Sequence, residues 1–206
     1  TSDNGPWLVY GDHAGSAGPL REGKQSAWEG GLRVPCLMRW PGKIPAGTTS
    51  NDLLMTIDLL PTIAKLTAAS LPTKPIDGLD VWPLIAGTPG AKNPHEAYAF
   101  YYQGDQLQSV ISGDGRWKQI YPHGYNSPRQ PPGMGGKRGA NVALRVERPA
   151  LYDLVNDIGE TKDVSVEHPD VVQSLNAFAE KMRTELGDSL EQRTGRAVRP
   201  ADKLRK

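Results

Sequence analysis

The segment TSDNGPWLVYGDHAGSAGPLREGKQSAWEGGLRVP, residues 1–35, decides the fold of this chain. It opens with a polar stretch that ends in a turn signal at Gly5, and glycines then recur through residues 6–31 with little apolar periodicity between them. Long loops within compact domains usually carry function. Because the first residues are also typical of the middle of a domain, we expect this segment to be a functional loop inside a larger unit.

Regular structure is predicted directly after this loop. Residues 34–40 are a short apolar run that a Pro-Gly pair ends, which predicts a buried strand. Asp58 can cap a helix that runs to about Ala69, and Gly87 closes a shorter helix. The longer helix places four apolar side chains on one face, at Leu59, Leu60, Ile63 and Leu66. This alternation of strand, helix and loop is typical of the end of an α/β domain.

The character of the sequence changes near residue 97. Residues 97–102 are rich in aromatic side chains, and Gly113-Asp114-Gly115 separates two strand-like runs, which predicts a hairpin. Residues 151–154 predict a further strand. Residues 122–140 are rich in proline and glycine and predict a loop, in which His123 is expected to be solvated.

A helix and a tail are predicted for the end of the chain. The helix begins at His168 or Asp170 and ends at Gly187. Its apolar stripe is formed by Val171, Leu175, Phe178, Met182 and Leu186. The predicted organisation is the end of an α/β domain (1–95), a small α+β subdomain with an antiparallel sheet and a C-terminal helix (96–187), and an extended basic tail (188–206).

Composition excludes several classes of protein. The formal net charge of the 206 residues is +1, so no nucleic-acid partner is expected. No apolar run reaches the roughly 18 residues of a membrane span, and no signal peptide opens the chain. The one cysteine, Cys36, excludes an internal disulfide framework, and we expect it to be a small buried hydrophobic residue.

Three residues in the opening segment are candidates for chemistry. Asp3 and Asn4 each present an oxygen, and a carboxylate beside a carboxamide suits a hard cation such as calcium, although Asp-Asn-Gly is also an ordinary turn sequence. Lys24 follows a glycine that allows close backbone approach, and its ammonium can neutralise an anion such as sulfate; the alternative is an ordinary surface lysine.

Two further polar residues of the segment have other expected roles. For His13 we favour a loop hydrogen bond over substrate contact. Glu29 is expected to bond the loop backbone or to pair with Arg33.

The order and spacing of these residues resemble the sulfatase family. The resemblance is carried by Asp-Asn-Gly at residues 3–5, Gly-Lys at 23–24 and Trp-Glu-Gly-Gly-Leu-Arg-Val-Pro at 28–35, and it continues through the Leu-Tyr-Asp-Leu run at 151–154. Residues 101–105, Tyr-Tyr-Gln-Gly-Asp, look like the branch of arylsulfatase A and galactosamine-6-sulfatase. Coverage extends over about residues 1–187, and the first third is the specific part.

The resemblance implies a fold, a metal and a set of site residues. The fold is alkaline-phosphatase-like, Asp3 and Asn4 are two ligands of one calcium ion, and Lys24 contacts the substrate sulfate. The other calcium ligands and the formylglycine nucleophile are expected upstream, in an N-terminal half that this chain lacks, so the chain alone is expected to be inactive. Two departures from the family pattern stand near these residues: Gln25 and Ser26 replace Gly-Thr, and Ile158 replaces a proline.

The expected function of the complete enzyme is hydrolysis of a sulfate monoester of an aryl or sugar compound. One alternative is a phosphate or phosphonate monoester hydrolase of the same superfamily, although two-zinc members place a histidine where Asn4 stands, because imidazole suits zinc. The other alternative is a truncated product without catalysis. By family analogy, we expect an exported protein, periplasmic or secreted, with its own N-terminal half as a partner.

Overall fold

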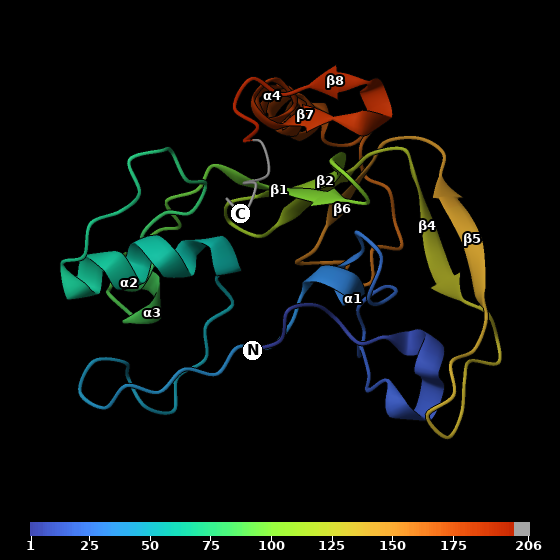
Figure 1. Ribbon diagram of the computed structural model, residues 1–206, viewed down its shortest axis with the longest axis horizontal. Coiled ribbons are helices and arrows are strands. Elements are labelled where there is room, and N and C mark those ends of the chain that lie inside the picture. Colours follow the sequence, from blue (N-terminus) through green and yellow to red (C-terminus); the bar gives the residue numbers. More distant parts are fainter. Residues whose placement is uncertain (200–206) are drawn as a thin grey trace, which may run out of the picture.

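The computed structural model describes residues 1–199 of the chain (Figure 1). The first part contains short helices joined by long connections: η1 (Leu8–His13), α1 (Glu29–Leu32), η2 (Thr56–Asp58), α2 (Leu59–Thr67) and α3 (Trp82–Ile85). The second part is mostly antiparallel β structure followed by one long helix, α4 (Pro169–Leu186). Mixed helices and antiparallel sheets agree with the predicted α/β and α+β character.

The central element is a four-stranded sheet in the order β1-β2-β3-β6, in which every neighbouring pair is antiparallel. Its strands are β1 (Ala97–Tyr102), β2 (Gln106–Ser112), β3 (Trp117–Ile120) and β6 (Ala150–Asp153). The predicted hairpin at residues 113–115 joins β2 to β3, with Val110 opposite Gln119 and Ile111 opposite Lys118. Tight turns of this kind favour glycine and aspartate, which explains why this connection could be predicted.

Both faces of this sheet are covered. Side chains of a strand alternate between faces. On one face Val110 and Leu151 pack against Leu175 and Ala179 of α4. On the other face Ile111, Ile120 and Tyr152 pack against Trp28, which comes from the opening segment. The opening segment is therefore a structural layer of the sheet, and this packing holds the loop that carries the candidate site.

The predicted strand at residues 34–40 does not form. This stretch is extended, has no strand partner within residues 1–199, and exposes Leu37 to 92 %. Cys36, expected to be buried, is exposed and free. A strand needs a neighbour for its backbone hydrogen bonds, and no described strand lies beside this one.

The helix α2 forms as predicted, but it turns its apolar face outward. Its buried residues are Pro61, Thr62 and Ala64. The four residues predicted to share one apolar face, Leu59, Leu60, Ile63 and Leu66, are between 38 % and 56 % exposed, and we call them the α2 apolar face. The helix is held instead by polar contacts, since Thr62 Oγ1 accepts a hydrogen bond from Val81 N at 3.0 Å.

Part of the predicted loop at residues 122–140 is a strand. β4 (His123–Pro128) pairs with β5 (Asn141–Val146) as a separate antiparallel ribbon. His123, expected to be solvated, is fully buried in β4, and its Nδ1 lies 2.7 Å from the carbonyl oxygen of Tyr121. Burial lowers the pKa of this imidazole, because the charged form is poorly solvated.

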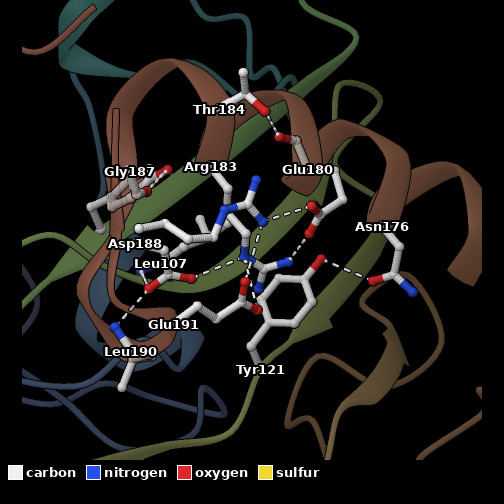
Figure 2. Close-up of polar contacts among 12 residues, drawn as sticks. Leu107, Tyr121, Asn176, Glu180, Arg183, Thr184, Gly187, Asp188, Leu190 and Glu191 are labelled. Atoms are coloured by element: carbon white, nitrogen blue, oxygen red, sulfur yellow. Dashed lines mark hydrogen bonds and ion pairs between the residues drawn. The ribbon is translucent and has the colours of Figure 1, made fainter. Parts of the chain in front are cut away.

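The predicted tail begins with ordered structure. β7 (Gly187–Asp188) and β8 (Arg193–Thr194) pair around the turn η3 (Ser189–Glu191), while residues 200–206 of the predicted tail lie outside the described residues. Figure 2 shows the reason: the buried Arg183 guanidinium of α4 lies 2.9 Å from Asp188 and 3.3 Å from Glu191. These ion pairs hold residues 187–194 against α4, so this segment is not extended.

No helix among residues 1–199 is long and apolar enough to cross a membrane.

Candidate calcium and sulfate site

The Asp3-Asn4 pair is anchored through the glycine that follows it. The amide of Gly5 donates a hydrogen bond to the carbonyl oxygen of Gly31 at 3.0 Å. A Cβ at Gly5 would lie 1.8 Å from the carbonyl oxygen of Gly30, so only glycine permits this approach. Asp3 is exposed and Asn4 is half-buried. Both side chains therefore stand at the surface on a fixed backbone.

Lys24 is anchored against the same short stretch of chain. Its amide donates to the carbonyl oxygen of Pro6 at 2.9 Å, and its Nζ lies 5.0 Å from the ring centroid of Trp7, within the range of a cation–π contact. Lys24 is half-buried and lines a small hollow with Trp7, Glu22, Gln25 and Asn141. Gln25, one departure from the family pattern, takes a positive φ of 80° and lies in this hollow.

These hydrogen bonds bring the backbones of the three candidate residues together. Gly5 and Pro6 bond to Gly31 and Lys24 respectively, so the Asp3-Asn4 segment and the Lys24 segment are neighbours although they are about twenty positions apart in sequence. A carboxylate, a carboxamide and an ammonium can together hold a hard cation and an anion.

His13 does not join this arrangement. It ends η1, its side chain is 60 % exposed, and its Nε2 lies 3.9 Å from Asp12. Asp12 Oδ1 accepts a hydrogen bond from Gly135 N at 3.0 Å, and the carbonyl oxygen of Val9 accepts from Gly133 N and Gly139 N. The glycine-rich loop after β4 is thus bound to η1, and His13 lies beside this loop.

The sequence did not predict a buried ion cluster next to the site, formed by Glu29, Lys118 and Glu160. Glu29 was expected to bond the loop backbone or to pair with Arg33, and its carboxylate instead pairs with Lys118 at 2.9 Å. Lys118 also lies 2.8 Å from Glu160, and burial raises the pKa of that carboxyl. The available signal was a charged residue, Lys118, within a predicted strand, because a charge that faces the core requires a partner.

The donors present fit part of a calcium shell. Calcium takes six to eight oxygen ligands, and Asp3 and Asn4 offer oxygens of the type that it prefers. Within residues 1–199, no group of three or more His, Cys, Asp or Glu side chains is placed to hold a metal ion.

Comparison with known proteins identifies the family. A family model described as the C-terminal region of aryl-sulfatase matches residues 93–202, and one described as N-sulphoglucosamine sulphohydrolase, C-terminal, matches residues 23–121. The chain belongs to the sulfatase family and corresponds to its C-terminal part.

Individual relatives agree with this assignment. The chain is 35 % identical over 181 residues to arylsulfatase A of Homo sapiens, covering 85 % of this chain and 35 % of that protein. It is 34 % identical to steryl-sulfatase of Mus musculus (86 % and 30 %) and 33 % identical to N-acetylgalactosamine-6-sulfatase of Canis lupus familiaris (88 % and 36 %). The chain therefore spans about a third of the length of these curated relatives.

A solved structure gives the same result for the fold. It comes from work on the metabolism of multiple glycosaminoglycans by Bacteroides thetaiotaomicron, and it is 27 % identical with a TM-score of 0.62. The match covers 82 % of this chain and 32 % of that chain. The fold is therefore that of the C-terminal part of a sulfatase.

Proposed function

We propose that the complete protein hydrolyses a sulfate monoester, and that this chain supplies two calcium ligands, Asp3 and Asn4, and a sulfate-binding lysine, Lys24. The observation that carries the proposal is a pair of backbone hydrogen bonds, from Gly5 to Gly31 and from Lys24 to Pro6. They place the backbone of the Asp3-Asn4 segment beside that of Lys24. When bound, calcium would offset charge on the sulfate oxygens, and the formylglycine expected upstream would supply the nucleophile.

Each of the three residues has a role that follows from its chemistry. Asp3 contributes a full negative charge to the cation, whereas Asn4 contributes only a dipole. Lys24 offsets charge on the sulfate oxygens, and such prearranged charge is usually the largest contribution to catalysis of this kind. The partial burial of Lys24 against Trp7 keeps its stem fixed and lowers the cost of reorganisation.

The proposal includes a partner for the exposed apolar surfaces. The α2 apolar face and the extended residues 34–40 expose several large apolar side chains, and surfaces of this kind mark interaction sites. We infer that they pack against the remaining two thirds of the enzyme, which would also supply the other calcium ligands. By analogy with the family, the complete protein is exported, periplasmic or secreted.

Calorimetric titration of the full-length protein with calcium and zinc tests the site. We expect Asp3→Ala to abolish calcium binding and sulfate-ester turnover together, and Asn4→Ala to weaken both so that excess calcium restores them in part. Asn4→His should shift the preference toward zinc without restoring turnover, because imidazole is a softer ligand. Asp12→Ala, an exposed carboxylate in the same segment, is the matched control and should bind calcium as the parent does.

The substrate class is tested with paired sulfate and phosphate monoesters. Faster turnover of the phosphate ester by the parent protein would support the alternative, a phosphate or phosphonate hydrolase.

In the calcium titration, if Asp3→Ala binds calcium as tightly as the parent, the Asp3-Asn4 pair is only a turn.

A further inference from the structure

The buried ion cluster joins the C-terminal sheet to the loop of the proposed site. Lys118 comes from β3, Glu29 begins α1, and Glu160 lies in the turn after β6. Their side chains are 0 %, 5 % and 0 % exposed, so the ammonium and both carboxylates are removed from water. Charges buried in this way persist only where the geometry between partners is good, and the loss of one partner leaves the others uncompensated.

Backbone contacts extend this cluster into the turn of α1. Glu160 Oε2 accepts a hydrogen bond from the amide of Glu29 at 2.8 Å, and the carbonyl oxygen of Glu160 accepts one from Arg21 Nη1 at 2.8 Å. The carbonyl oxygen of Arg21 in turn accepts from Gly30 N at 2.8 Å. Glu160, in the second part of the chain, thus holds the turn that begins at Glu29 at two points: directly at the amide of Glu29, and through Arg21 at the amide of Gly30.

Both segments of the proposed site rest on this same turn. Gly5, next to Asp3 and Asn4, donates to Gly31. Gly31 also lies against the carbonyl oxygen of Gly23, since a Cβ on Gly31 would come within 2.6 Å of it, and Gly23 directly precedes Lys24. A shift of the turn would therefore move the Asp3-Asn4 segment relative to Lys24.

We propose that Lys118 is a positioning residue that sets the relative placement of the Asp3-Asn4 pair and Lys24. It acts through Glu29 and Glu160 and touches neither the cation nor the ester. Its effect on catalysis rests on the proposed function, whereas the mechanical link from β3 to the turn is measurable without any activity.

Hydrogen exchange in the full-length protein tests the link. Lys118→Met removes the ammonium and keeps the aliphatic stem. We expect the amides of Gly5, Lys24 and Gly30 to exchange about tenfold faster in this variant, because local opening becomes easier. Arg183→Met is the matched control, because Arg183 is also a buried cation between carboxylates but belongs to α4, which covers the other face of the sheet.

The comparison is made at a temperature at which both variants are folded. Should Lys118→Met fail to fold, Glu29→Gln replaces it; this variant keeps the backbone contact to Glu160 and weakens one ion pair, and the same three amides should exchange faster. Unchanged exchange in the variant that folds, or equal acceleration in Arg183→Met, would show that the cluster only stabilises the fold and would overturn the proposal.

Kinetic measurements test whether the contact between Lys118 and the turn of α1 affects the proposed site. We expect Lys118→Met to lower the kcat for a sulfate ester about tenfold and to weaken calcium binding, while Arg183→Met leaves both unchanged at the same temperature. Unchanged kcat and calcium affinity in Lys118→Met would overturn the positioning role. A parent protein that hydrolyses no sulfate ester would refute the proposed function instead, and the exchange rates would still decide whether Lys118 holds the turn.

Discussion

Two lysines of this chain show how surroundings determine what a charge can do. Lys118 lies between two buried carboxylates, so its charge is already neutralised within the protein. Lys24 stands over an aromatic ring and forms no ion pair with any carboxylate of residues 1–199, so its charge remains available to an anion. The first arrangement is suited to holding structure and the second to binding a ligand.

Replacement of Lys24 tests this distinction. In the full-length enzyme, we expect Lys24→Ala to lower the rate of sulfate-ester hydrolysis about 100- to 1,000-fold, as is common for the loss of one electrostatic stabiliser. The melting temperature should change little, because the backbone amide of Lys24 still bonds to Pro6. Lys65→Ala, which removes an exposed lysine paired with Asp80, is the control and should keep the parental rate. A parental rate in Lys24→Ala would make Lys24 an ordinary surface lysine.

The acid dependence of stability should reflect Asp153. The Arg116 guanidinium, 2.8 Å away, lowers the pKa of this carboxyl from 3.8 to about 2. Because the pKa is lower in the folded state, the stabilisation is present above pH 3.8 and is lost as the pH falls through about 2. Arg116 is 44 % exposed, so we expect about 1 kcal/mol rather than the full value of the shift.

Urea unfolding measures this contribution. The free energy of unfolding of Asp153→Asn should fall below that of the parent by about 1 kcal/mol at pH 6, and the gap should close near pH 2. A gap that is the same at both pH values would mean that the Arg116 pair does not set the pKa of Asp153.

At the scale of elements, some predictions depended on local sequence and others on distant partners. The β2–β3 hairpin and α4 were predicted because turn glycines and an apolar stripe identify them within a short window. The strand β4 was missed because its proline and glycine content favours a loop, and only pairing with β5 makes it a strand. Sequence reasoning likewise identified Asp3, Asn4 and Lys24 as candidates, but it could not predict the partners of Glu29, which lie 89 and 131 positions away.

The ribbon after α4 depends on one buried cation. Arg183 lies within 2.6 to 3.3 Å of Glu180, Asp188 and Glu191, and its guanidinium stands 4.8 Å from the ring of Tyr121 (Figure 2). Removal of one partner from such a cluster leaves buried charge unpaired, so Arg183→Met should lower the free energy of unfolding by about 3 kcal/mol.

An exposed ion pair between α4 and the segment after β8 provides the comparison for Arg183. Glu185 bonds to Arg196 at the surface, and Arg196→Met should lower the free energy of unfolding far less than Arg183→Met does, because water already solvates both charges. Urea unfolding of both variants checks the difference. If the two substitutions cost the same, the burial of Arg183 has no energetic consequence.

At the scale of the whole molecule, the apolar surface is divided unequally. The second part of the chain buries its apolar side chains in two clusters on the two faces of the sheet. In the first part, α2 and residues 34–40 expose large apolar side chains. The periodicity of α2 correctly predicted a helix with an apolar face, but the position of that face could not be predicted, because periodicity does not say which body covers it.

Ile63, at the centre of the α2 apolar face, allows a test of what covers it. It is 56 % exposed, so Ile63→Lys should leave the free energy of unfolding of the 206-residue chain nearly unchanged. An exposed apolar face favours self-association, and we expect the lysine to weaken it. In the full-length protein, the same lysine would be forced into an apolar contact, and we expect a loss of about 2 kcal/mol. Val166→Lys, at an exposed valine outside α2, is the control and should be neutral in both proteins. Urea unfolding and sedimentation of both lengths measure these effects. If Ile63→Lys is equally neutral in the full-length protein, the α2 apolar face is not covered by the rest of the enzyme, and the inferred packing partner is wrong.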